Sequence, residues 1–283
     1  MARSVSFRRV ASSSHKAETR YNVRMRLHVE ELGIGPPVLF LHGLFGSGDN
    51  WRPQAKHLSK HNHVVLVDLR NHGRSPHAPE MSLELMASDI EDTVQSLGFD
   101  RIGILGHSLG GKVAMECVLR NPSGYSGMVV VDIAPKRYPV RHMEIIHGMR
   151  AVAVAEPGSR RDADSVLAEY VSEARVRAFL LKSYDTSSQG VKSWRINIDA
   201  VEHEYEHIRG GLSENLGEAC YHGPALFIGG ELSDYLQPED HERICQLFPK
   251  AQVESIADAG HWVHAEQPER FLKVLDGFRD AWS

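Results

Sequence analysis

The ten residues IGILGHSLGG, at positions 102–111, constrain the fold of this chain more than any other stretch. A largely apolar run leads into Gly-His-Ser-Leu-Gly, and residues 112–119 that follow are typical of a helix. A chain that turns at once from strand to helix strains the residue at the bend, and glycines two places before and after it give clearance. Gly106 and Gly110 occupy those places. The pattern therefore predicts that Ser108 lies on a sharp turn at a sheet edge, with its hydroxyl free.

Apolar runs and amphipathic stretches alternate along most of the chain. The predicted strands, besides the one that ends in the turn, are 23–31, 37–41, 64–68, 127–132, 224–228 and 251–256. The predicted helices, besides 112–119, are 49–60, 82–98, 238–248 and 268–282. This alternation predicts an α/β fold with a mostly parallel central sheet and helices on both faces.

Two segments do not follow this alternation of predicted strands and helices. Residues 135–217 contain helical stretches and no convincing strand, so we expect an inserted helical cap between two parts of one core, 22–134 and 218–283. Residues 1–21 are rich in Arg and Ser and carry no acid before Glu18. This is the composition of a mitochondrial transit peptide or of a disordered polar tail, which predicts a mitochondrial or cytoplasmic protein.

Composition excludes several classes of function. The net charge of −5 and the lack of a basic, aromatic-rich stripe argue against nucleic-acid binding. No apolar run approaches the roughly 18 residues of a membrane span. The three cysteines form no C-x-x-C pair, which favours a reducing compartment, and nothing in the pattern specifies an oligomeric state.

A serine hydroxyl is a poor nucleophile near neutral pH, so Ser108 needs an imidazole base and a carboxylate that holds the imidazole in one tautomer. His261 lies just past the last predicted strand, at the same sheet edge, and His264 is the fallback. Asp132 ends the strand after the nucleophile helix, and Asp234 follows the next core strand. The residues by themselves leave both acids open.

The loop HGLFG, after the strand at 37–41, is expected beside the nucleophile turn. Backbone N–H groups of Leu44 and of Leu109 are therefore the predicted donors to a developing oxyanion. Apolar lining of a substrate pocket is predicted for four aromatic residues, Phe45, Trp51, Tyr138 and Trp194.

A rival motif, His-Glu-x-x-His, spans His203 to His207 on a predicted helix and matches a zinc-protease pattern. Ser213, however, occupies the place of the third histidine of the longer metzincin pattern. The face of this helix that must be buried carries Ile198, Val201, Tyr205 and Ile208. The sequence therefore favours a site that needs neither a metal nor a cofactor.

Between residues 37 and 269 the chain carries, in order, the motifs HGLFG, VDLRNHGRSP, GHSLGGK, VVVDIAPKRY, SWRINIDA and AGHWVHAEQPE. This series resembles the α/β-hydrolase superfamily, and within it the small esterase and thioesterase branch of the bacterial short esterases and the mitochondrial abhydrolase-domain protein of animals. The resemblance implies an α/β-hydrolase fold and a Ser-Asp-His hydrolase of carboxylic esters or acyl-CoA thioesters.

The resemblance also bears on the acid. It implies that the acid stands in the D-I-A-P motif, which is Asp132 here. Asp199, in RINIDA, is read as the acid in some relatives. The usual position after the strand at 224–228 carries Ser233, with Asp234 one place later.

Two functions are consistent with these residues. The first is two-step acyl transfer from a small-molecule acyl ester or thioester through a covalent acyl-Ser108 intermediate, with Asp132 and His261 completing the triad. The second is a ligand-binding receptor on the same fold that turns over slowly or not at all, because fold does not fix function.

Overall fold

The central sheet orders its seven strands β1-β3-β2-β4-β5-β8-β9 within residues 25–186 and 192–282, which the computed structural model describes. Only the β1–β3 pair is antiparallel, and the other neighbours pair in parallel. The mostly parallel sheet is therefore confirmed. The strands are β1 (Val29–Leu32), β2 (Pro37–Leu41), β3 (His63–Val67), β4 (Ile102–His107), β5 (Tyr125–Val131), β8 (Ala225–Gly230) and β9 (Ala251–Ile256).

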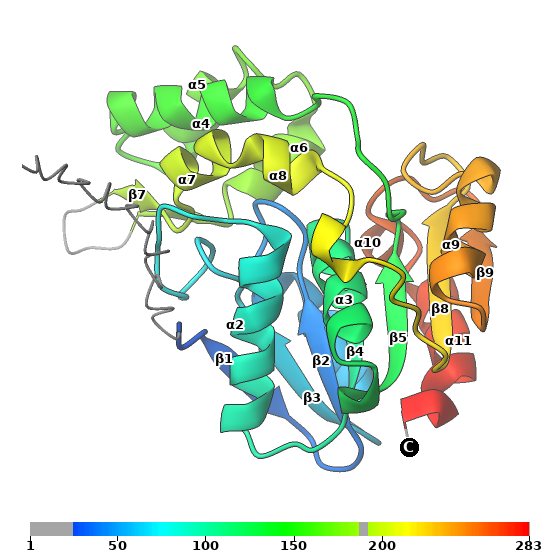
Figure 1. The fold of residues 1–283 in the computed structure, drawn as a ribbon. Coiled ribbons are helices and arrows are strands. Elements are labelled where there is room, and N and C mark those ends of the chain that lie inside the picture. Colours follow the sequence, from blue (N-terminus) through cyan, green and yellow to red (C-terminus); the bar gives the residue numbers. More distant parts are fainter. Residues whose placement is uncertain (1–24, 187–191, 283) are drawn as a thin grey trace, which may run out of the picture.

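Helices cover both faces of this sheet (Figure 1). One face packs against α2 (Leu83–Ser96), α3 (Leu109–Arg120) and α9 (His241–Leu247), and the other against α1 (Arg52–Leu58), α10 (Val263–Glu266) and α11 (Pro268–Phe278). Short 3-10 turns lie at η1 (Gly48–Trp51), η2 (Pro122–Gly124), η4 (Pro238–Asp240) and η5 (Arg279–Trp282).

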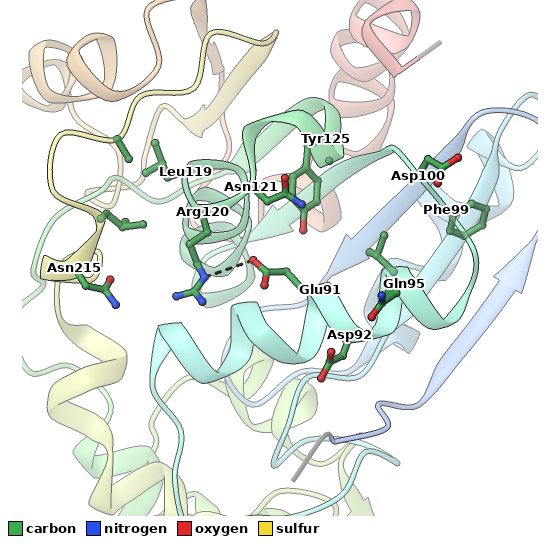
Figure 2. A pocket seen from close by; sticks show the side chains of 14 residues that line it. Glu91, Asp92, Gln95, Phe99, Asp100, Leu119, Arg120, Asn121, Tyr125 and Asn215 are labelled. Carbon is green, nitrogen blue, oxygen red and sulfur yellow. Dashed lines mark ion pairs between the residues drawn. The ribbon is translucent and has the colours of Figure 1, made fainter. Parts of the chain in front are cut away.

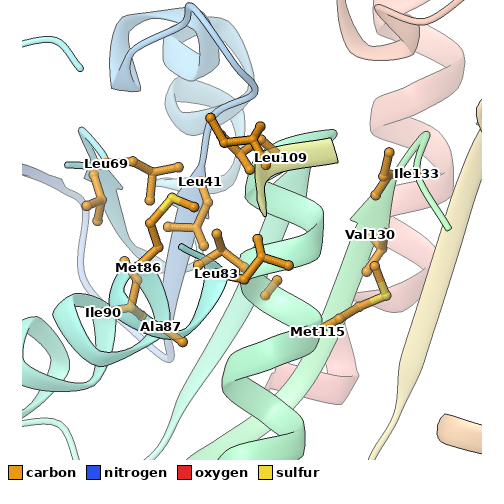
Figure 3. Close-up of a cluster of buried hydrophobic side chains, with 14 of the residues drawn as sticks. Leu41, Leu69, Leu83, Met86, Ala87, Ile90, Leu109, Met115, Val130 and Ile133 are labelled. Carbon is orange, nitrogen blue, oxygen red and sulfur yellow. The ribbon is translucent and has the colours of Figure 1, made fainter. Parts of the chain in front are cut away.

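Alternate strand residues enter two separate clusters of apolar side chains. Leu39 and Leu41 join the cluster on the α2–α3 face, whereas Val38 and Phe40 join the one on the α1–α11 face. Figure 3 shows part of the first cluster, where side chains of β2, α2 and α3 meet. Because both faces of the sheet are covered at its centre, the inner strands β2, β4, β5 and β8 are mainly apolar in sequence, whereas the edge strands β1 and β9 are partly exposed and carry glutamates.

The cap, residues 135–217, leaves the sheet after β5 and returns before β8. Its helices are α4 (Met143–Ala155), α5 (Arg160–Leu167), α6 (Ala174–Leu180), α7 (Ile198–His203) and α8 (Tyr205–Arg209), with η3 at Glu214–Leu216. They lie above the carboxyl ends of the parallel strands (Figure 1). The cap also holds a small antiparallel ribbon of β6 (Tyr184–Asp185) and β7 (Ser193–Trp194). The expectation of a strandless cap was wrong, because two-residue strands are too short to show alternation.

The first strand is shorter than predicted. It begins at Val29, which pairs with Val67, the last residue of β3, so no partner strand remains for residues before it. The proposed leader at 1–21 lies outside the described residues. No described helix is long and apolar enough to cross a bilayer.

Candidate active site

Ser108 lies on the turn between β4 and α3 with φ 51° and ψ −117°, a conformation that side chains rarely adopt. A Cβ at Gly106 would come within 2.1 Å of the Gly110 carbonyl oxygen, and one at Gly110 within 2.6 Å of the His42 carbonyl oxygen. Only glycine fits at both places. The predicted sharp turn at the sheet edge is confirmed.

His261 follows β9, and its Nδ1 lies 2.7 Å from Oδ2 of Asp132, at the end of β5. Asp132 is fully buried, and its Oδ1 accepts the N–H of Gly230 at 3.0 Å. The hydroxyl of Ser233 donates to Oδ2 as well. A carboxylate only accepts hydrogen bonds, so this contact assigns the imidazole proton to Nδ1 and leaves Nε2 as a base.

The two alternative acids are engaged elsewhere. Asp234 accepts two hydrogen bonds from Arg141 at 2.6 and 2.7 Å, which lower the pKa of its carboxyl group, and its side chain is 67% exposed. Asp199, on α7, pairs with Arg150 at 2.8 Å and is 83% exposed. Among the hydrogen bonds of the described residues, neither carboxylate contacts His261. The structure therefore brings Asp132 to the imidazole.

Ser108 and His261 line one cavity of about 370 Å³ beneath the cap. Cap side chains form much of its apolar wall, namely Ile145, Val171, Val176, Phe179 and Leu180. Charged side chains on the same wall carry both signs, as Arg141 and Glu144 illustrate. The cavity therefore offers an apolar space next to the serine. Because its charged side chains balance in sign, it does not favour a charged ligand.

The loop after β2 lies against the serine turn, since Leu44 lines the same cavity as Ser108. The N–H of the next residue, Phe45, donates to Nε2 of His72 at 3.2 Å. Leu109 is the first residue of α3. Within the described part of the chain, no hydrogen bond engages the N–H of Leu44 or of Leu109, so both donors are free beside Ser108.

Comparison with known proteins settles the family. Residues 36–268 match the family model described as the alpha/beta hydrolase fold. The chain belongs to the α/β-hydrolase family. It is 39% identical over 251 residues to the sn-1-specific diacylglycerol lipase ABHD11 of Mus musculus, a match that covers 86% of this chain and 80% of the relative.

Two further relatives agree with this assignment. Esterase YbfF of Escherichia coli is 36% identical over 240 residues, 84% of this chain and 91% of its own. A solved structure described as a marine microorganism esterase superposes with a TM-score of 0.86 at 38% identity, and covers 90% of this hydrolase and 99% of that chain. The resemblance to the small esterase branch is thus confirmed.

The four aromatic residues predicted to line the pocket of this hydrolase have different positions. Phe45 and Trp51 line the cavity. Tyr138 instead lines an adjoining space of about 30 Å³ that also reaches Ser108. Trp194 was assigned wrongly: it is buried inside the cap, where its indole N–H donates to the Met149 carbonyl oxygen at 2.9 Å. A buried indole N–H needs an acceptor, and Trp194 finds one on α4, so its ring packs within the cap and is not part of the cavity lining.

Several buried histidines surround the cavity. Burial lowers the pKa of His107 well below its ordinary value and that of His264 to about 3. His107 donates from Nε2 to the carbonyl oxygen of His261 at 2.9 Å. His264, the fallback base, packs its ring 4.2 Å from that of Trp51, and no described hydrogen bond joins its ring to a carboxylate. Both imidazoles are therefore neutral, and of the two His107 contacts His261 directly, whereas His264 packs between Trp51 and Phe271.

The His-Glu-x-x-His motif does not lie on one helix as predicted. The helix breaks at Glu204, with φ −93° and ψ 9°, which separates α7 from α8. His203 and His207 are 81% and 67% exposed, while Tyr205 points inward. Across residues 25–186 and 192–282, no group of three or more His, Cys, Asp or Glu is placed to hold a metal ion.

A larger groove of about 850 Å³ lies between α2 and α3, at the end of α3 remote from Ser108 (Figure 2). Polar side chains such as Gln95 and Asn121 line it, and Glu91 pairs with Arg120 across 3.5 Å. Its described lining contains no serine, cysteine or histidine. This groove therefore lacks a serine or cysteine paired with a histidine, whereas the smaller cavity contains Ser108 and His261.

Proposed function

We propose that this protein is a serine esterase that cleaves carboxylic esters or acyl thioesters through a covalent acyl-Ser108 intermediate. The observation that supports it most is the 2.7 Å contact between His261 Nδ1 and Asp132, in a cavity wall shared with the strained Ser108. The relatives named as an esterase and a lipase align over more than four-fifths of the chain and favour the same chemistry.

Each group has a role in this mechanism. Oγ of Ser108 attacks the acyl carbonyl carbon and passes its proton to Nε2 of His261, while Asp132 holds Nδ1–H and stabilises the imidazolium. The N–H groups of Leu44 and Leu109 stabilise the oxyanion. His261 then protonates the departing alkoxide or thiolate, and a water molecule releases the acid by the same steps.

The cavity favours substrates with an apolar acyl group. Burial of each methylene against the cap wall contributes about 0.8 kcal/mol, so a chain of several carbons gains binding energy before the carbonyl reacts. Val176 and Phe179 of α6 form part of this wall. We place the acyl chain there, under the cap.

The test is a panel of p-nitrophenyl esters, acyl-CoA thioesters and a diacylglycerol. We expect a burst of p-nitrophenol from the wild type and none from Ser108→Ala. Asp132→Asn should lower kcat by about 10⁴-fold, because an amide in place of the carboxylate no longer holds the imidazole in the tautomer that leaves Nε2 as the base. The comparison variant Asp234→Asn changes an exposed carboxylate that pairs with Arg141, and it should lose no more than about ten-fold in kcat, far less than Asp132→Asn.

Three results would contradict the proposal. One is a burst that persists in Ser108→Ala, and another is an Asp234→Asn variant as slow as Asp132→Asn. The third is tight binding of acyl ligands with no burst at all, which would favour the receptor considered from the sequence.

A further inference from the structure

The ring of Tyr235 lies flat against the imidazole of His261. The two ring centroids are 3.9 Å apart and the planes differ by 22°. Tyr235 belongs to the loop after β8 and lines the same cavity as Ser108. Aromatic pairs in proteins usually have centroids 4.5–7 Å apart, so this is a close face-to-face contact.

Both the cap and its own loop hold the Tyr235 ring in place. The guanidinium of Arg141 lies 4.8 Å from the ring centroid and is itself fixed by two hydrogen bonds to Asp234. The ring of Tyr138 stacks at 5.2 Å, and its hydroxyl donates to the Tyr235 carbonyl oxygen. The tyrosine therefore has little freedom to leave the imidazole.

The imidazole itself needs such a support. Its hydrogen bond from Nδ1 to Asp132 fixes one ring atom, but leaves rotation of the ring about that contact open. The ring of His107 lies 4.7 Å away at 44°, so it is a looser neighbour than Tyr235. Tyr235 is the described aromatic ring whose plane comes nearest to parallel with the imidazole.

We propose that Tyr235 is a positioning residue for the esterase reaction proposed above, on which this inference rests. Its ring holds the imidazole of His261 in the plane that serves both Asp132 and Ser108. Its electron-rich face also stabilises the imidazolium that forms when Ser108 attacks.

The charged groups around His261 do not obscure the effect of Tyr235 on the imidazolium. Asp132 faces Nδ1, and the exposed Asp234 pairs with Arg141. The charged side chains that line the same cavity are Arg141, Glu144, Glu173 and Arg175, two of each sign. Three buried histidines also lie near the imidazole, and burial lowers the pKa values of all three, His107, His142 and His264. They stay neutral near pH 7, so they do not mask a change in the pKa of His261.

The experiment compares Tyr235→Phe, which keeps the ring, with Tyr235→Leu and Tyr235→Met, which fill space without an aromatic face. We expect Tyr235→Phe to keep wild-type kcat within about two-fold. Both aliphatic variants should lose about ten-fold in kcat with KM within about two-fold. The acidic limb of kcat/KM should move down by about half a pH unit in the aliphatic variants, because the imidazolium is less stabilised. Thermal unfolding checks that the variants are folded.

An NMR titration of labelled histidines tests the same contact without turnover. It compares the pKa of His261 in Ser108→Ala and in the double variant Ser108→Ala/Tyr235→Leu. A lower pKa for His261 in the double variant supports the proposal. An unchanged pKa overturns it, and so does wild-type kcat in both aliphatic variants, or a Tyr235→Phe variant as slow as they are. If the wild type cleaves no ester, the proposed function fails, whereas the titration still decides whether Tyr235 stabilises the imidazolium.

Discussion

His72 supports the loop that carries the expected oxyanion donor. It is fully buried, donates from Nδ1 to the Arg70 carbonyl oxygen at 2.9 Å, and accepts the N–H of Phe45 at Nε2. Phe45 has φ 65°, in the left-handed region, next to Leu44. Burial lowers the pKa of His72 to about 3, so Nε2 stays an acceptor at neutral pH. We infer that this hydrogen bond keeps the Leu44 N–H in place.

His72→Ala should therefore weaken stabilisation of the oxyanion. The loss of one buried hydrogen bond, about 1–3 kcal/mol, corresponds to a fall in kcat of roughly 5–150-fold. Affinity for a trifluoromethyl ketone, which forms an oxyanion on Ser108, should fall in parallel, while affinity for the product acid stays unchanged. His77→Ala, an exposed change in the same loop, is the control. Equal ketone affinity in wild type and His72→Ala would rule this role out.

At the residue scale, sequence motifs predict some residues of the site but not all of them. Gly106 and Gly110 reveal the turn at Ser108, because only a tight strand-to-helix bend needs both. The contact between Tyr235 and His261 has no such signal, because a ring stack between two loops obeys no spacing rule. Ser233, noted only as the residue in the usual acid position, turns out to donate to Asp132.

At the scale of elements, α3 joins the nucleophile turn to the cap. Lys112, one turn after Ser108, is 2% exposed and donates from Nζ to the carbonyl oxygens of Ile208 and Gly210 at the end of α8. One turn further, Oε2 of Glu116 accepts the N–H of Ser213 at 3.1 Å. A charged amine at this depth costs free energy, and burial lowers the pKa of Lys112 to about 7. We infer that it is retained because it fastens the cap.

Lys112→Met keeps the apolar stem but leaves these carbonyl oxygens without a donor. We expect a loss of about 1–3 kcal/mol in the free energy of unfolding. Amide hydrogen exchange across 205–213 should quicken, with a rise in KM and little change in kcat. Lys56→Met, at an exposed position on α1, is the matched control. Exchange in 205–213 that stays at the wild-type rate would contradict the anchoring role.

Periodicity predicts the regular elements well and the cap less well. The helix expected at 82–98 is observed as α2, which begins after Ser82, whose hydroxyl accepts the Leu85 N–H at 3.2 Å. The strands β6 and β7 have two residues each, and the break at Glu204 has no proline or glycine to mark it. Tertiary packing decides such short features, so sequence pattern does not reveal them.

At the scale of the whole molecule, buried histidines tie stability to pH. His72 and His264 have pKa values lowered to about 3 by burial, below the roughly 6.5 of an unfolded chain. Between these values only the unfolded chain takes up their protons, so stability falls as pH falls from about 6.5 toward 3. The two groups together contribute about 3 kcal/mol per pH unit, a large share of the 5–15 kcal/mol of a typical domain.

Urea unfolding at pH 7, 6, 5 and 4 tests this dependence. We expect the free energy of unfolding to drop steeply below pH 6. His264→Asn should make the slope shallower by about 1.4 kcal/mol per pH unit, because one proton-binding group is gone from the unfolded chain. A free energy that stays constant from pH 6 to pH 4 would show that these imidazoles accept protons in the folded state.

The cap departs from β5 and rejoins at β8, two strands that are hydrogen-bonded neighbours, and the N–H of Met128 bonds to Pro224 at 3.0 Å where the chain re-enters the sheet. The main chain of the insertion is thus joined to the core between two neighbouring strands, and side chains such as Lys112 and Arg141 add further contacts. A cap of a different shape could be exchanged at this place without interrupting any strand of the sheet, so the acyl chain length that the cavity accepts can change while the strands that carry Ser108 and Asp132 stay intact.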